Sequence, residues 1–166
     1  MREPLKPIEL FRLVAEHEVE AILVGGVAAV IQGASYTTFD VDIVYRRTPE
    51  NIARLATALR LADARYLDPA GHRLEPTAEK RTSPGHHLLV TRFGRLDVLA
   101  YIGEHLDYEQ LLPDSRLVQV GDFQIMVLDL QRLVELKQRS TRDKDRAVLP
   151  NLLRALRLRG EEDDTT

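Results

Sequence analysis

The chain has 166 residues, of which 44% are hydrophobic and 30% are charged, a balance typical of one globular domain with a substantial core. The formal net charge of −3 argues against a dedicated, DNA-specific reader, and the absence of cysteine excludes disulfides, thiolate zinc sites and cysteine nucleophiles. No hydrophobic run is long enough to cross a bilayer and no secretory signal opens the chain, so we expect a cytoplasmic protein without a membrane partner.

The first half of the chain alternates helical and strand patterns. Apolar residues spaced three and four apart predict helices, and short runs rich in β-branched residues predict strands. The expected elements are a helix over Pro7–Glu16, a strand over Ala21–Val24, a helix over Val27–Gln32, a strand over Thr38–Arg46 and a helix opened by Thr48 and Pro49.

The second half predicts two hairpins and then helices. Residues 68–85 are rich in proline, glycine and charge, which predicts a long loop that serves as a lid or binding loop. The hairpins pair 87–91 with 96–101 and 117–120 with 123–127. Asp129 caps the next helix, and 143–158 predicts a helical region interrupted near Pro150. We expect one domain over 1–160 and a disordered acidic tail over 161–166.

Asp40 and Asp42 lie two residues apart in the second predicted strand. Because side chains alternate between the two faces of a strand, both carboxylates point to one face. Two like charges on a largely buried face are unfavourable unless a cation or a proton neutralises them. The pattern therefore indicates a divalent metal site, which requires a further acid and a phosphate partner.

Asp97 and the glycine pair Gly25–Gly26 are the candidates for those two parts. Asp97 is a single carboxylate in an apolar strand pattern. Three oxygen donors without histidine or cysteine suit Mg²⁺ or Mn²⁺ rather than zinc. Glycines at a strand-to-helix turn let phosphate oxygens approach the backbone and the first N–H groups of the helix. The pair matches neither the Walker pattern nor the dinucleotide fingerprint.

The combination of these motifs resembles the nucleotidyltransferase superfamily that includes DNA polymerase β. That family has a glycine pair, an Asp-x-Asp on the next strand and a third acid on a later strand. The matching residues, all within Ala21–Tyr101, are Gly25, Gly26, Asp40, Asp42 and Asp97.

Two further stretches are similar to the minimal and abortive-infection, toxin-type members of that superfamily. One is the context Gly-Gly-Val-Ala and Thr-Thr-Phe-Asp-Val-Asp around the motifs. The other is LDLQRLVELKQRSTRDKDRAV, which resembles their closing helix, where a lysine and an Arg-x-Lys-Asp segment line the nucleotide side of the cleft. The resemblance thereby gives Lys137 and Arg142 as triphosphate-binding residues.

The resemblance implies an α+β nucleotidyltransferase fold with a mixed β-sheet, helices packed against it and further C-terminal helices. It implies transfer of a nucleoside monophosphate from an NTP to a hydroxyl acceptor (a tRNA, a protein side chain or a small molecule). Asp40 and Asp42 would hold Mg²⁺ and the triphosphate. Asp97 would hold the metal that activates the acceptor and would take its proton. A toxin–antitoxin or phage-defence role with an antitoxin partner follows from the same resemblance.

Alternatives remain for each part. Asp40 and Asp42 could also be solvated acids at the end of a strand, and Asp97 could be an acid near a hairpin turn. The glycines could form only a tight turn. Lys137 and Arg142 are also compatible with a solvated helix face. His86 and His87 face opposite ways on a strand, which favours a surface or loop role over metal binding. Val27, where the family often has serine, favours a degenerate nucleotide- or partner-binding module.

Overall fold

The computed structural model describes residues 4–67, 70, 72–74 and 84–165. Most of the loop predicted for 68–85 therefore lies outside the described residues, as does Thr166 at the end of the predicted tail. Among the helices that are described, none combines the length and the apolar character needed to cross a membrane.

The predicted helices and strands all occur in the predicted order, and the structure adds short elements that the sequence did not predict, namely β3, β4, β7, β8 and α5. The helices are α1 (Pro7–Glu16), α2 (Gly25–Ile31), α3 (Pro49–Leu61), α5 (Tyr108–Leu111), α6 (Leu130–Arg139) and α7 (Asp143–Asp164), with a 3₁₀ turn η1 (Leu112–Asp114). The strands are β1 (Ala21–Val24), β2 (Asp40–Tyr45), β3 (Arg65–Leu67), β4 (Arg73–Leu74), β5 (His87–Thr91), β6 (Gly94–Leu99), β7 (Tyr101–Ile102), β8 (Leu106–Asp107), β9 (Ser115–Val120) and β10 (Phe123–Leu128). Helix α2 begins at the glycine pair itself, two residues earlier than predicted.

The main sheet is mixed, which confirms the predicted α+β class. Over the described part of the chain its strand order is β4-β3-β5-β6-β2-β1-β10-β9. Strand β1 runs parallel to β10, and β2 runs parallel to β6, whereas the other neighbouring pairs are antiparallel. Strands β7 and β8 form a separate small hairpin. The central position of β2 places Asp40 and Asp42 between β1 and β6.

The core lies around β1 and β2 because elements cover both faces of these strands. All four residues of β1 are buried, as are Val41, Ile43 and Tyr45 of β2. Helix α2 packs on β1 and β2, and its buried Ala28 and Ala29 are small enough for the helix to approach the strands closely. This close packing fixes the glycine turn between β1 and α2 directly beside the aspartates of β2.

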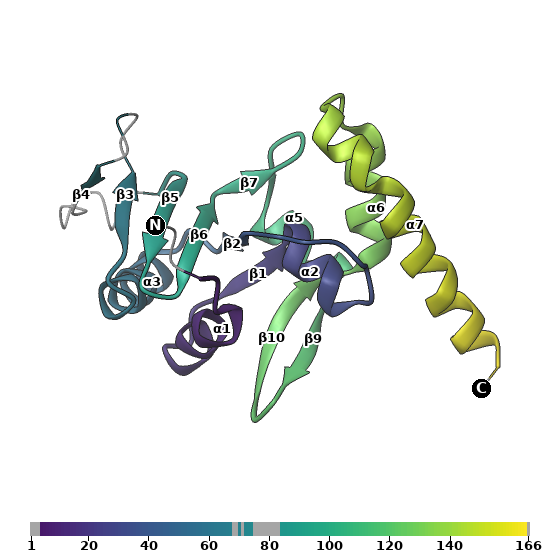
Figure 1. Ribbon diagram of the computed structural model, residues 1–166. Helices are drawn as coiled ribbons and strands as arrows, with labels where there is room; N and C mark the ends of the chain where they lie inside the picture. The colour runs from purple at the N-terminus through teal and green to yellow at the C-terminus, as the bar shows by residue number, and fades with distance from the viewer. Residues whose placement is uncertain (1–3, 68–69, 71, 75–83, 166) are drawn as a thin grey trace.

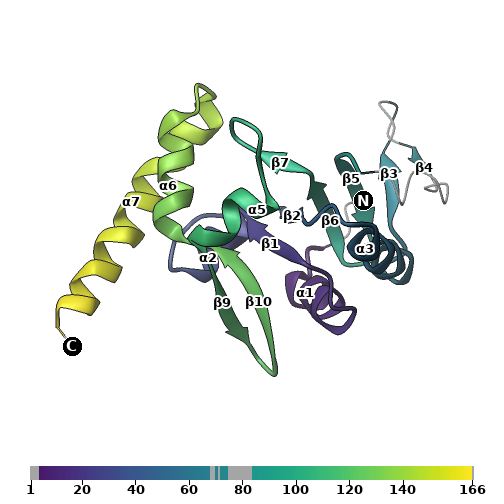
Figure 2. The same ribbon diagram turned by 180° about the vertical axis from the view of Figure 1, so that it is seen from behind.

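The C-terminal helices lie together at one end of the molecule, and α3 lies with β3 and β5 at the opposite end (Figure 1). The view from behind shows the same arrangement, with α7 running along α6 and then projecting away from the rest of the molecule, so that the C-terminus lies at the free end of α7 (Figure 2). The last turn of α6 and the first turn of α7 are joined by a short connection over 140–142.

Helix α7 differs from the prediction in two ways. It continues through Pro150, where the sequence predicted an interruption, because Pro150 is exposed while Leu152 and Ala155 on the opposite side are buried in the contact with α6. That packing offsets the one backbone hydrogen bond that proline cannot donate. The helix also includes 161–164, predicted to be disordered, and the Thr165 hydroxyl donates to the backbone oxygen of Glu161 (2.6 Å).

Candidate metal centre

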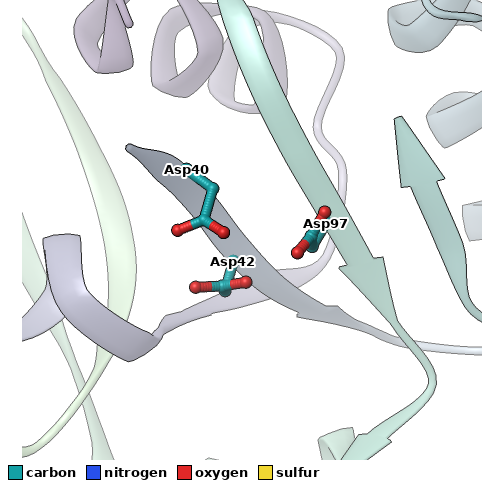
Figure 3. A group of neighbouring side chains, drawn as sticks. All are labelled: Asp40, Asp42 and Asp97. Carbon is teal, nitrogen blue, oxygen red and sulfur yellow. The ribbon is translucent and has the colours of Figure 1, made fainter. Parts of the chain in front are cut away.

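Sheet register brings the three predicted aspartates together. Strands β2 and β6 are parallel neighbours in which Asp42 lies opposite Asp97 and Asp40 lies opposite Arg95. One carboxylate oxygen from each of the three aspartates lies within 4.8 Å of the others. Figure 3 shows Asp40 and Asp42 one above the other on β2, with Asp97 reaching toward them from β6. Such a spacing allows one cation to be shared by all three carboxylates.

The three side chains are withdrawn from solvent to different degrees. Asp97 is 8% exposed, whereas Asp40 and Asp42 are partly buried. Burial, followed by the charges of Asp40 and Asp97, raises the pKa of Asp42 from 3.8 to about 7. Burial also raises the pKa of Asp97, although hydrogen bonds from Arg95 work against that rise. The cluster is thus difficult to ionise fully without a nearby positive charge.

Arg95 supplies part of that positive charge. Its Nε atom donates to Oδ1 of Asp97 (3.2 Å) and lies 4.0 Å from Oδ2 of Asp40. Because Arg95 and Asp97 are two residues apart on β6, their side chains share one face of the strand. Sequence reasoning missed Arg95, although the same period-two argument that joined Asp40 to Asp42 could have found it.

The glycine turn leaves space for the carboxylate of Asp42. Gly25 has φ of +70°, in the left-handed region, and a Cβ at this residue would lie 2.4 Å from Oδ2 of Asp42. Any side chain here would therefore strain the backbone and displace a predicted metal ligand. Val24, the residue before Gly25, lies opposite Asp42 in the β1–β2 register, which accounts for the close approach.

Gly26 has a different set of neighbours, which the sequence did not indicate. A Cβ at Gly26 would lie 2.8 Å from the Tyr36 hydroxyl and 2.9 Å from Oγ1 of Thr38. Oγ1 of Thr38 donates to the backbone oxygen of Asp40 (3.2 Å). Val27, by contrast, is only 5% exposed and belongs to the core, so it brings no polar group to the turn. The segment that precedes β2 therefore places two hydroxyl groups at the glycine turn.

Lys137 is within electrostatic reach of the acidic cluster, and both Lys137 and Arg142 are paired with Asp145. Lys137 Nζ lies 2.5 Å from Oδ1 of Asp145, and Arg142 Nε donates to Oδ2 of Asp145 (2.9 Å). The Ser140 hydroxyl also donates to Oδ2 of Asp145 (2.5 Å). Burial by itself would raise the pKa of Asp145, but the three hydrogen bonds lower it to about 2. Asp145 thus forms two ion pairs, and they are part of a buried network.

The end of α6 and the start of α7 are nevertheless within electrostatic reach of the metal centre. The positive charges of Lys137 and Lys144 act to lower the pKa of Asp42, against the effects of burial and of the other aspartates. The negative charge of Asp145 raises the pKa of Tyr36. Two basic groups of the C-terminal helices, Lys137 and Lys144, thus favour the ionised form of Asp42.

His87 departs from the surface or loop role that the sequence favoured. It is 2% exposed on β5, its ring contacts the hydroxyl of Tyr66, and its centroid lies 6.2 Å from that of Tyr45. The reason is register, since His87 lies opposite the fully buried Val98 of β6. Tyr45 is an odd-numbered residue of β2, so this cluster lies on the sheet face opposite to the aspartates.

A hollow of about 450 Å³ on the sheet face opposite to the aspartates is lined by Phe11, Leu23, Ile43 and Tyr108, among others. Because Ile43 and Asp42 are adjacent in β2, their side chains point to opposite faces. None of the three aspartates lines this hollow. It is therefore separate from the candidate metal centre.

The comparisons with known proteins bear on the fold. No protein-family model matches the chain, and no curated protein matches its sequence. Among solved structures, the chain is similar to a Thermotoga maritima protein whose assignment as a nucleotidyltransferase is itself provisional. The TM-score is 0.52 with 13% sequence identity, and the match covers 96% of each chain. A likeness at this identity shows a nucleotidyltransferase-like fold, and it does not by itself show an activity.

Proposed function

We propose that this protein is a divalent-metal-dependent nucleotidyltransferase, which moves a nucleoside monophosphate from an NTP to a hydroxyl acceptor. The observation that carries the proposal is the convergence of Asp40, Asp42 and Asp97 from two parallel strands onto one spot beside a glycine turn. The nucleotidyltransferase-like fold supports the same reading.

The donor set fits Mg²⁺ or Mn²⁺. Three carboxylates on adjacent strands offer only oxygen ligands, and their mutual repulsion is relieved when a cation is shared. When bound, such ions would offset the charge of the triphosphate and stabilise the attacking and leaving oxygens of an in-line displacement. We propose Asp40 and Asp42 as ligands on the triphosphate side and Asp97 as the ligand on the acceptor side.

The chain's own groups account for the proton and for the substrate's position. In the proposed step the acceptor oxygen bonds to the α-phosphorus, the bond to the β-phosphate oxygen breaks, and pyrophosphate leaves. The acceptor proton is proposed to pass to the Asp97 carboxylate, which acts as general base. Gly25 and Gly26 are proposed to contact phosphate through their backbone. Lys137 and Arg142 are the proposed phosphate contacts, held in place by Asp145.

The acceptor classes we propose are a tRNA, a protein side chain and a small molecule. The proposed setting is a cytoplasmic toxin–antitoxin or phage-defence system with an antitoxin partner. The basic residues of the C-terminal helices support an anionic acceptor such as RNA.

A specific observation favours a second candidate. This candidate is a module of the same fold that binds a nucleotide or a partner but catalyses no transfer. Val27 is in the core instead of offering a hydroxyl, and Lys137 is already paired with a buried carboxylate. Both features would weaken triphosphate binding relative to a site with a serine and an unpaired lysine.

Incubation with each labelled NTP and Mg²⁺, in the presence of total RNA, lysate protein or small-molecule fractions, separates the two candidates. The proposed enzyme transfers label to one fraction, and Asp42→Ala abolishes that transfer. Asp122→Ala is the matched control, because Asp122 is an exposed acid at the β9–β10 turn that pairs with Arg12. Nucleotide binding without transfer would support the module. Absence of both binding and transfer would overturn the enzyme and the nucleotide-binding form of the module.

A further inference from the structure

The hydroxyl of Tyr36 is a hydrogen-bond donor that no group in the described part of the chain uses. Tyr36 lies in the connection between α2 and β2 and is partly buried. Its hydroxyl approaches the backbone of Gly26 so closely that a Cβ there would be 2.8 Å away. The neighbouring Thr38 hydroxyl differs, because it already donates to the backbone oxygen of Asp40.

The surroundings of this hydroxyl are negatively charged. Burial, followed by the charges of Asp42, Asp40 and Asp145, raises the pKa of Tyr36 to about 12. The phenol is therefore protonated at any ordinary pH, so its O–H group can donate a hydrogen bond to an acceptor. The hydroxyl lies within electrostatic reach of Asp40 and Asp42 and also of Asp145, the partner of Lys137 and Arg142.

We propose that Tyr36 binds a phosphate oxygen of the NTP through its O–H group, in place of the serine hydroxyl that Val27 lacks. This inference rests on the proposed function, since it concerns a substrate of the same site. A polyphosphate is the anion that suits the location, because its oxygens could bind a metal held by Asp40 and Asp42 and also accept the Tyr36 O–H. Gly26 is required because any side chain would push the hydroxyl away from the turn.

Binding measurements with Tyr36→Phe test the inference. The probes are Mn²⁺ alone, Mn²⁺ with inorganic tripolyphosphate, and Mn²⁺ with each NTP. The binding of each probe is measured by isothermal titration calorimetry. Loss of a hydrogen bond to a charged group is expected to weaken the affinity for tripolyphosphate and NTP alike by about 10- to 100-fold. The affinity for Mn²⁺ alone should be unchanged, and in the transfer reaction KM for NTP should rise while kcat changes little.

Tyr108→Phe is the matched control. Tyr108 is a buried tyrosine on α5 that lines the hollow on the opposite face of the sheet and lies over the Arg46 guanidinium. The Tyr108→Phe variant should bind every probe with the same affinity as the unmodified protein. Thr38→Val gives the contrasting result, because loss of the Thr38 contact with Asp40 should weaken the binding of Mn²⁺ alone.

Three outcomes would overturn the inference. Unchanged affinity of Tyr36→Phe for tripolyphosphate and NTP would show that the hydroxyl makes no contact with the ligand. A loss confined to NTP would show that it contacts the sugar or base. A weaker affinity for Mn²⁺ alone, or a variant that does not fold, would show a structural role. Failure of the proposed function gives a different result, in which the unmodified protein binds no tripolyphosphate and Asp42→Ala behaves identically.

Discussion

At the scale of single residues, Asp42 shows how burial and like charge act together. It lies between Val24 of β1 and Asp97 of β6, two residues from Asp40, and its pKa is about 7. The ordinary value is 3.8, so the folded protein holds a proton there over a pH range in which the unfolded chain does not. In the metal-free protein, ionised Asp42 is therefore destabilising.

This shift predicts the pH dependence of stability in EDTA. A group whose folded pKa is raised stabilises below its unfolded pKa, and the benefit is lost as pH rises through the folded pKa. The free energy of unfolding should thus fall between about pH 4 and about pH 7 and then level off. Asp42→Asn should reduce this slope and stabilise the metal-free protein at pH 8 by roughly 1–3 kcal/mol.

Urea unfolding of the two proteins at pH 5 and pH 8 measures this effect, with Asp122→Asn as the exposed control. A marked loss of stability in Asp42→Asn at pH 8 would contradict the electrostatic account and show that the carboxylate has a structural role.

Gly25 gives a second prediction at this scale. Gly25→Ala introduces both left-handed strain and a Cβ 2.4 Å from Oδ2 of Asp42, so it should reduce stability and Mn²⁺ affinity together. Gly33→Ala is the matched control, because Gly33 has φ of +103° and nothing within 4 Å of its Cβ position. The control should lose only the strain energy, about 1–2 kcal/mol, and retain Mn²⁺ affinity. Equal Mn²⁺ affinities in both variants would contradict the crowding argument.

At the scale of elements, Asp145 joins α6 to α7. Its side chain is 3% exposed and is bonded to Lys137 at the end of α6, Ser140 in the connection and Arg142 at the start of α7. The network holds two basic groups, Lys137 and Arg142, in fixed positions. The two helices are thereby joined to each other through charge as well as through packing.

Removing this carboxylate should destabilise the protein strongly. Asp145→Ala leaves Lys137 without its partner and should lower the free energy of unfolding by about 3–5 kcal/mol. Asp143→Ala, at an exposed position of the same first turn, should cost far less. Because the pKa of Asp145 is lowered to about 2, its contribution is present above about pH 4 and is lost as pH falls toward 2. Urea midpoints at pH 7 and pH 2.5 measure the loss of stability and its dependence on pH. An equal difference between Asp145→Ala and the unmodified protein at the two pH values would contradict the predicted pH dependence.

At the scale of the whole molecule, the candidate site depends on parts that are far apart along the chain. The glycine turn and β2 come from the first third, Asp97 from the middle, and the basic connection from the C-terminal helices. A ligand that contacts all of them should stabilise the complete fold, because it binds the folded state and not the unfolded chain.

Thermal unfolding tests this directly. With Mg²⁺ and NTP at 100 times the dissociation constant, the gain is about 2.7 kcal/mol, which raises the Tm of a chain of this size by about 5–10 °C. Asp97→Ala should abolish the shift, whereas Asp122→Ala should retain it. An unchanged Tm of the unmodified protein at millimolar ligand would count against the site as a whole.

Local sequence patterns are sufficient to predict the main helices and strands and to place Asp40 and Asp42 on one face of a strand. The bounds of α1 and β1 agree with the prediction because proline, glycine and apolar spacing act over a few residues. The shared face of the two aspartates follows from the period of a strand, whatever the rest of the fold does.

Tertiary structure alone decided which distant groups meet. The register of β2 with β6 places Asp97 opposite Asp42 and brings Arg95 to the cluster, and no local pattern specifies that register. The approach of Tyr36 to Gly26 and the burial of Asp145 and His87 likewise depend on packing between separate elements. Local preferences act through neighbouring residues, whereas these contacts arise only when the sheet and the C-terminal helices are assembled.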